Sequence, residues 1–192
     1  YGDGLTGNPF LYDRNDAAKM LLGVNDAGLP DDLPRNSQGV ALIGDPRNDS
    51  HLVISQLHVA MLKFHNAVVD WLRERGTAEA AVFAEAQRLV RWHYQWVVLL
   101  DFLPQLIGEE LTASLLMRGP RFFVGERCYA IPLEFADAAY RYGHSQIRHR
   151  YQVNASSRQL PLFPDFVGFN PVPAAHTIDW GSFFDCPGRP PA

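Results

Sequence analysis

The stretch Phe135-Ala-Asp-Ala-Ala-Tyr-Arg-Tyr-Gly-His-Ser-Gln-Ile-Arg148 decides how the rest of the chain is interpreted. Its pattern predicts a helix that carries one histidine, His144, among aromatic and arginine side chains. Gly143 is unfavourable by about 1 kcal/mol in a helix interior, and close approach of a flat ligand to the backbone would justify it. A helical histidine beside Tyr and Gly is also common as a structural residue, so the stretch alone leaves both interpretations open.

Composition narrows the class of protein. The chain has 192 residues, 47% hydrophobic and 20% charged, which predicts one globular domain with a substantial core. The formal net charge is -4 and no basic stripe occurs, which argues against nucleic acid as a partner. The two cysteines, Cys128 and Cys186, form no C-x-x-C-H haem-attachment signal, and they leave the compartment unknown. No signal peptide and no apolar run of membrane-spanning length is recognisable, so we expect a soluble chain without a membrane span.

Two long helices are predicted in the first half. Residues 1–44 are rich in turn formers and predict an irregular wrap, with a short strand pair at 19–22 and 40–43. Asp45 and Pro46 make a favourable helix start. Apolar residues then recur at helical spacing: Leu57, Met61, Phe64, Val68 and Leu72. A second helix is predicted from Ala78, closed by Pro104 and Gly108, and its core candidates are Phe83, Leu89, Val90, Trp96, Val97, Leu99 and Leu100.

Shorter helices and strands are predicted in the second half of the chain. A short helix is expected at 109–117, then a loop with a short strand at 121–124. Ile131 and Pro132 open the helix of His144, which is expected to fade near Asn154. The fold class is therefore mainly α, with the two long helices and the His144 helix around one core.

The remaining histidines are predicted to have structural roles. His51, His58 and His65 share one helix face, but successive members lie roughly 10 Å apart along the axis, too far for one metal site. We expect them to pack or to form hydrogen bonds. The same structural interpretation applies to the other three histidines, one expected in the core and two in surface or loop positions: His93, His149 and His176.

Three segments in order resemble the animal-type haem peroxidases, the peroxidase-cyclooxygenase superfamily. Ala139-Tyr-Arg-Tyr-Gly-His-Ser-Gln-Ile147 resembles the proximal-histidine helix of that family. Gly44-Asp-Pro-Arg-Asn-Asp-Ser-His51, followed by 57–66, resembles its distal-arginine helix. Residues 83–96 and 101–104 resemble the helix between them. Order and spacing agree over nearly the whole chain, and the set is closest to the bacterial branch.

The resemblance implies an animal haem peroxidase-like helical fold, incomplete at both ends. The family's glutamine-Phe-x-x-histidine segment, which holds the distal acid-base histidine, does not occur in this chain, and neither does its later Arg-x-x-Asp-His-Gly segment. Residues 1–192 then correspond to the central part of a haem peroxidase domain. Its expected parts are 1–44 (irregular wrap), 45–75 (distal-arginine helix), 78–104 (core helix), 132–154 (proximal-histidine helix) and 160–192 (loop-rich tail).

The resemblance assigns three site residues. His144 would be the proximal ligand of the haem iron, the usual ligand type in peroxidases. Arg47 would be the distal arginine, whose fixed charge polarises the peroxide O–O bond; the alternative is a salt-bridged arginine in a first helical turn. Arg141 lies one turn before His144 on the same face and would contact a haem propionate, with a solvated salt bridge as the alternative.

Two positions depart from the family pattern. Ser50 stands where animal members often carry a glutamate esterified to the haem, so the resemblance implies non-covalent haem b. His51 follows it and either faces the distal pocket or is displaced to the surface. Arg141 stands where fatty-acid-oxygenating relatives carry a catalytic tyrosine, which favours peroxidase over dioxygenase chemistry.

The function implied is that of a haem peroxidase, which reduces hydrogen peroxide with oxidation of a small donor, as in the response to oxidative stress. The alternatives are a non-catalytic or truncated remnant and a fatty-acid dioxygenase of the same superfamily. Calcium is implied only for a longer protein, because the family's calcium loop has no counterpart in this chain.

Overall fold

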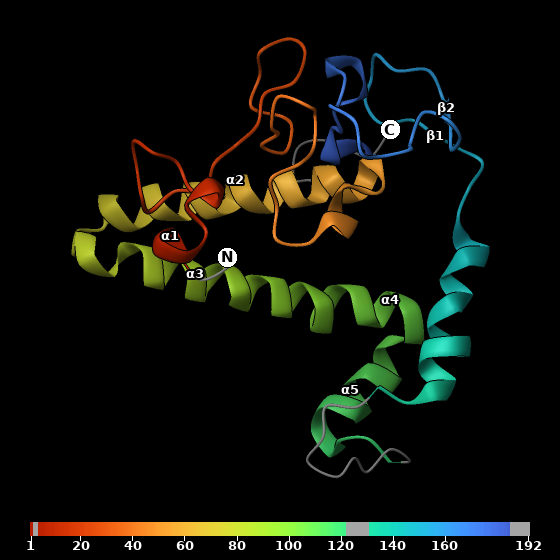
Figure 1. The fold of residues 1–192 in the computed structure, drawn as a ribbon. Coiled ribbons are helices and arrows are strands. Elements are labelled where there is room, and N and C mark those ends of the chain that lie inside the picture. Colours follow the sequence, from red (N-terminus) through yellow and green to blue (C-terminus); the bar gives the residue numbers. More distant parts are fainter. Residues whose placement is uncertain (2–3, 122–130, 185–192) are drawn as a thin grey trace. The chain divides into compact units, whose positions relative to one another are not determined.

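The computed structural model describes residues 1, 4–121 and 131–184 (Figure 1). They form two units. The first comprises residues 1–90 and 149–192, and the second comprises residues 91–148. The predicted strand at 121–124 falls almost wholly outside the described residues. The mainly helical class is confirmed by the elements that follow.

The first unit is built on helix α2 (Leu52–Glu74), which three separate segments of the chain cover. Near its start, Leu52 packs with residues of the 149–184 segment, among them Phe166. In its middle, Val59 and Leu62 pack against the N-terminal segment. Its last turns pack against the beginning of helix α3 (Glu79–Trp96), through these residues: Val68, Val69, Leu72, Val82, Ala86 and Val90. Figure 1 shows α2 alongside the beginning of α3.

The start and end of α2 follow from local chemistry. The predicted helix start at Asp45 is a 3-10 turn, Pro46–Asp49, and α2 begins three residues later. His51 caps α2, because its Nδ1 accepts a hydrogen bond from the Val53 N–H at 3.3 Å. The helix ends before Gly76, whose φ of 76° is the left-handed conformation that glycine adopts easily.

Length and composition alone would let α2 cross a membrane, with a mean hydropathy of 1.3, and it is the one such helix among the described residues. Core helices of soluble proteins pass the same test. The three apolar clusters packed along α2 are what a core helix requires.

The N-terminal segment has little regular structure. It contains α1 (Gly4–Gly7) and a 3-10 turn (Pro9–Leu11), followed by isolated bridges at Tyr12–Met20, Gly23–Asp32 and Arg35–Ala41. The predicted pairing of 19–22 with 40–43 was wrong. Met20 pairs with Tyr12 instead, and its backbone N–H and C=O are bonded to the Asn66 side chain of α2 at 2.8 and 3.0 Å.

The segment after residue 148 is extended. Strands β1 (Arg150–Tyr151) and β2 (Leu160–Pro161) pair antiparallel, and two 3-10 turns follow, Ala174–His176 and Trp180–Ser182. The predicted continuation of the His144 helix to Asn154 was therefore wrong. The cause is tertiary packing, because Val153 is fully buried in the cluster around Phe166 and Tyr151 packs against that cluster.

The second unit contains short helical pieces. After the end of α3 come a π-helical segment (Val97–Phe102), α4 (Leu103–Ile107) and α5 (Glu109–Arg118). Further along lie another π-helical segment (Phe135–Ala139) and a 3-10 helix (Tyr140–Gln146).

Of the two residues predicted to close the second long helix, Gly108 ends it and Pro104 does not. Because proline lacks an N–H and crowds the carbonyl four residues earlier, the helix widens into the π segment, and it then continues as far as Gly108. Four expected core residues of this region are more than 40% exposed, because no described segment of the second unit covers them: Trp96, Val97, Leu99 and Leu100.

Candidate functional site

Arg47 lies on the 3-10 turn Pro46–Asp49, in the first unit. Asp45 caps the turn, since its Oδ1 accepts the Arg47 backbone N–H at 3.0 Å. The Arg47 side chain is 88% exposed and folds back onto Asp45, with Nη2–Oδ2 at 2.6 Å and Nε–Oδ1 at 3.0 Å. These hydrogen bonds lower the pKa of Asp45 to about 2. Arg47 is thus a salt-bridged arginine at the surface of the first unit.

The end of this turn is fixed by a buried charged cluster, which we call the Arg35 junction: Arg35, Asp32 and Asp49. Their side chains are 7%, 1% and 4% exposed. Arg35 donates to both oxygens of Asp49, Nη1–Oδ2 and Nη2–Oδ1, each at 2.7 Å. It also donates to both oxygens of Asp32, at 2.9 and 3.1 Å, and to the Gly39 carbonyl at 3.0 Å.

These contacts use all five N–H groups of the guanidinium. Burial by itself would lower the pKa of Arg35, but the hydrogen bonds to Asp49 and Asp32 outweigh burial and raise it above its ordinary value. Arg35 therefore stays charged, and it is surrounded by two carboxylates.

A second set of contacts joins the turn to residues 166–172. The Phe169 N–H donates to the Asp49 carbonyl at 2.7 Å, and the Gly168 N–H donates to the Ser50 carbonyl at 3.2 Å. The fit at Gly168 is so close that a Cβ there would lie 1.8 Å from the backbone carbonyl oxygen of Asp49. The Asp32 carboxylate contacts the same segment, because it accepts the Val172 N–H at 3.1 Å.

Ser50 and His51 flank the turn. The Ser50 hydroxyl donates to the Arg47 carbonyl at 2.7 Å, so it stabilises the turn. His51 is the N-cap of α2 and lies against the Phe166 ring, with ring centroids 5.5 Å apart. Burial lowers the pKa of His51. Its role in the first unit is structural.

The other two histidines of α2 form hydrogen bonds, as expected. The Nε2 of His65 donates to the Ala18 carbonyl at 2.9 Å, which leaves Nδ1 to accept from the Tyr1 hydroxyl at 3.1 Å. The Nδ1 of His58 lies 3.3 Å from the Asn48 amide nitrogen. Burial lowers the pKa of His58 and of His65, so both rings are neutral at pH 7.

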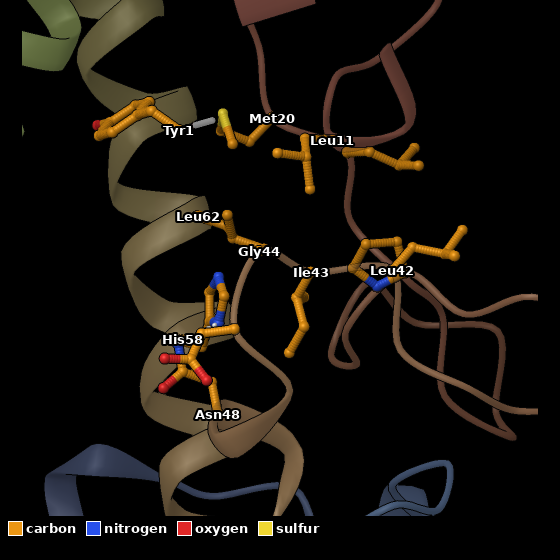
Figure 2. Close-up of a pocket in the computed structure, with 12 residues that line it drawn as sticks. Tyr1, Leu11, Met20, Leu42, Ile43, Gly44, Asn48, His58 and Leu62 are labelled. Atoms are coloured by element: carbon orange, nitrogen blue, oxygen red, sulfur yellow. Dashed lines mark hydrogen bonds between the residues drawn. The ribbon is translucent and has the colours of Figure 1, made fainter. Parts of the chain in front are cut away.

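A pocket of about 330 Å³ adjoins the Arg47 turn within the first unit. Its polar end is formed by Asp45, Asn48 and His58. Figure 2 shows His58 and Asn48 at one end of the pocket and Tyr1, Met20 and Leu11 at the other. The pocket therefore joins a polar end beside the Arg47 turn to an apolar body.

His144 lies in the second unit, on the 3-10 helix Tyr140–Gln146. Its side chain is exposed and makes no hydrogen bond to any described residue. Arg141 precedes it by three residues, and since side chains at i and i+3 eclipse in a 3-10 helix, the two share a face. No described atom lies within 4 Å of a Cβ built on Gly143, so the backbone beside His144 is open.

Within the described part of the second unit, the His144 imidazole is thus exposed beside an open stretch of backbone, and an imidazole is a residue type that can ligate a haem iron. Arg47 belongs to the first unit and His144 to the second, and each is positioned by the contacts of its own unit. Among the described residues, no group of three or more His, Cys, Asp or Glu side chains could hold a metal ion, and calcium in a longer protein stays a prediction.

Sequence reasoning missed the Arg35 junction. Asp32 and Arg35 stand in a run of turn-forming residues, where charged side chains are normally solvated. Only the buried, paired geometry distinguishes them, and no spacing in the sequence signals it.

Comparison with known proteins identifies the family. The family model for animal haem peroxidase matches residues 9–170. The human (Homo sapiens) probable oxidoreductase PXDNL is 28% identical over 138 residues, which is 69% of this chain and 9% of that protein. Chorion peroxidase of Drosophila melanogaster is 29% identical over 143 residues, 67% of this chain and 17% of that protein. Human thyroid peroxidase is 29% identical over 140 residues, 69% of this chain and 14% of that protein.

The chain thus spans less than a fifth of the length of each of these three relatives. The family model, by contrast, covers most of the chain and includes the Arg47 turn, α2, α3 and His144. The chain belongs to the animal haem peroxidase family.

Proposed function

We propose that this chain is the central part of a haem peroxidase domain of the bacterial branch, which reduces hydrogen peroxide and oxidises a small donor. The observation that carries the proposal is the family match over 9–170, which includes both the Arg47 and the His144 segments in the family's order. The chain covers only 9% and 17% of the lengths of two relatives, which supports the view that it corresponds to one part of such a protein.

In this proposal His144 is the proximal ligand of a non-covalent haem b. Its ring is exposed among the described residues of its unit, which suits ligation through one nitrogen and orientation through the other. Arg141, on the same face, would pair with a propionate. Ser50 supports non-covalent binding, because its hydroxyl cannot form the ester that a glutamate forms, and it is engaged with the Arg47 carbonyl.

Arg47 is the proposed distal arginine. The haem, when bound, supplies the redox chemistry that cleaves peroxide. The guanidinium of Arg47 would stabilise the negative charge that develops on the peroxide oxygens as the O–O bond breaks. Its exposure and its location on a short capped turn support this role, because they leave the guanidinium accessible to an anion from solvent. Its charge is fixed at any physiological pH.

A haemin titration of the purified chain, followed by Soret absorbance, tests the ligand. We expect a shifted and saturable band that is lost in His144→Ala. The matched control is His149→Ala, which removes another exposed histidine five residues away. Equal titrations of His144→Ala and the parent chain would remove His144 from the proposal.

Peroxide consumption by the haemin-loaded chain tests Arg47. We expect Arg47→Ala to lower the rate by at least a hundredfold, on the order of the loss when one charge-stabilising group is removed. Arg75→Ala, at the other end of α2, should leave the rate unchanged.

The same experiments separate the alternatives. A chain that loads haemin through His144 but consumes no peroxide would be a non-catalytic remnant. Oxygen uptake with a polyunsaturated fatty acid would instead indicate a dioxygenase, which the arginine at position 141 disfavours.

A further inference from the structure

We infer that Arg35 is a positioning residue for Arg47, acting through Asp49 in the Arg35 junction. The inference rests on the proposed function, since it concerns how the distal arginine of that function is held. Arg35 touches neither the reacting atoms nor Arg47 itself. It fixes the backbone from which Arg47 projects.

The first step is the stiffness of the turn. Asp49 is its last residue, two positions after Arg47. The Ser50 N–H donates to the Arg47 carbonyl at 3.2 Å, and the Asn48 N–H donates to the Asp45 carbonyl at 3.1 Å. With these bonds in place, a shift of Asp49 is transmitted to the Cα of Arg47.

The second step is that Asp49 is held by its side chain as well as its backbone. Its carboxylate meets Arg35 through two parallel bonds of 2.7 Å, a bidentate geometry that fixes both distance and plane. Its carbonyl accepts from Phe169 at 2.7 Å. Arg35 is itself fixed by Asp32, which is bonded to the Val172 N–H. The junction therefore sets the turn in register with residues 166–172.

The third step is the choice of residue types in the Arg35 junction. Two carboxylates share one guanidinium in a buried position, where apolar residues of similar volume would often give equal or greater stability. The buried charges are therefore better explained by a role in fixing geometry than by a contribution to stability. Lysine cannot replace Arg35 in it, because an ammonium group lacks the planar fork that meets two carboxylates at once.

The test compares Arg35→Lys with a matched control, Arg73→Lys. Arg73 also bridges two carboxylates, with Nη2–Asp16 at 2.9 Å and Nε–Glu79 at 3.0 Å, but it lies at the far end of α2. The rate of peroxide consumption is measured in haemin-loaded chains. We expect Arg35→Lys to lower it by about tenfold to a hundredfold, as a displaced catalytic group does. Arg73→Lys should leave it unchanged.

A double-mutant comparison shows whether the loss passes through Arg47. If Arg35 acts by positioning, Arg35→Lys causes no further loss in an Arg47→Ala background. A loss of equal size in that background would overturn the inference. Should Arg35→Lys fail to fold, Asp49→Asn removes the same bidentate pair and undergoes the same comparison.

Amide hydrogen exchange of the chain without haemin provides a readout independent of activity. In Arg35→Lys we expect faster exchange at Ser50 and Phe169 than in Arg73→Lys, at matched global stability. Unchanged exchange would overturn the inference by itself. An Arg47→Ala chain with the parent rate would refute the catalytic role of Arg47, and the exchange data would still decide whether Arg35 holds the turn.

Discussion

Replacement of Gly168 by alanine tests the contact that joins the C-terminal segment to the Arg47 turn. The added Cβ would lie 1.8 Å from the Asp49 oxygen, whereas ordinary contact begins at 3.4 Å, so the two backbones must separate by about 1.6 Å. That movement breaks the bonds from Gly168 to Ser50 and from Phe169 to Asp49. At about 1 kcal/mol each, the loss is about 2 kcal/mol. Alanine also reduces the conformational freedom of the unfolded chain, which offsets about 0.4–1 kcal/mol of this loss.

We therefore expect Gly168→Ala to lower the free energy of unfolding by about 1–1.6 kcal/mol. At about 2–4 °C per kcal/mol for a chain of this size, its Tm should fall by about 2–6 °C. Circular dichroism at 222 nm during heating and urea titration measures both quantities. The control is Gly44→Ala, where no described atom lies within 4 Å of the new Cβ and no loss is expected. A Gly168→Ala chain as stable as the parent would refute the close approach.

Three further predictions concern the first unit. Because burial lowers the pKa of His65 below its ordinary 6.5, the unfolded chain binds more protons than the folded one, and the free energy of unfolding should fall as the pH drops below about 6.5; His65→Gln should flatten that slope in urea titrations at pH 7 to 5. Val69→Ala removes two methyl groups from a fully buried site and should cost about 1.5–3 kcal/mol in urea, against less than about 0.5 for the exposed Val40→Ala. Asn66→Ala leaves the backbone N–H and C=O of Met20 unpaired and should cost about 2–3 kcal/mol, with faster amide exchange at Met20 as its signature.

The long helices were predictable because their signals are local. The apolar spacing of α2 follows one period for six turns, and the glycine that ends it needs a left-handed conformation. The short helix at Glu109–Arg118 was equally readable from its flanking glycines. Local signals misled at Pro104, because a π-helical segment absorbs a proline that a regular α-helix would not.

The wrong prediction for the segment after Gln146 has a different cause. Residues 147–154 have no strong preference of their own, and the burial of Val153 against Phe166 draws them into an extended conformation. The residues of the candidate site show the same difference between local and tertiary signals. Arg47 and His144 were found through motif resemblance, whereas Asp32, Arg35 and Asp49 come together only through tertiary structure.

The coverage of α2 by segments from both ends of the chain has a consequence for biosynthesis. Leu52, at the start of α2, acquires the last member of its buried cluster only after Ile178 has been made. At about 5–20 residues per second, the start of the helix waits several seconds with its apolar side uncovered. We therefore expect a chaperone that covers nascent α2 during this interval to raise the yield of folded protein.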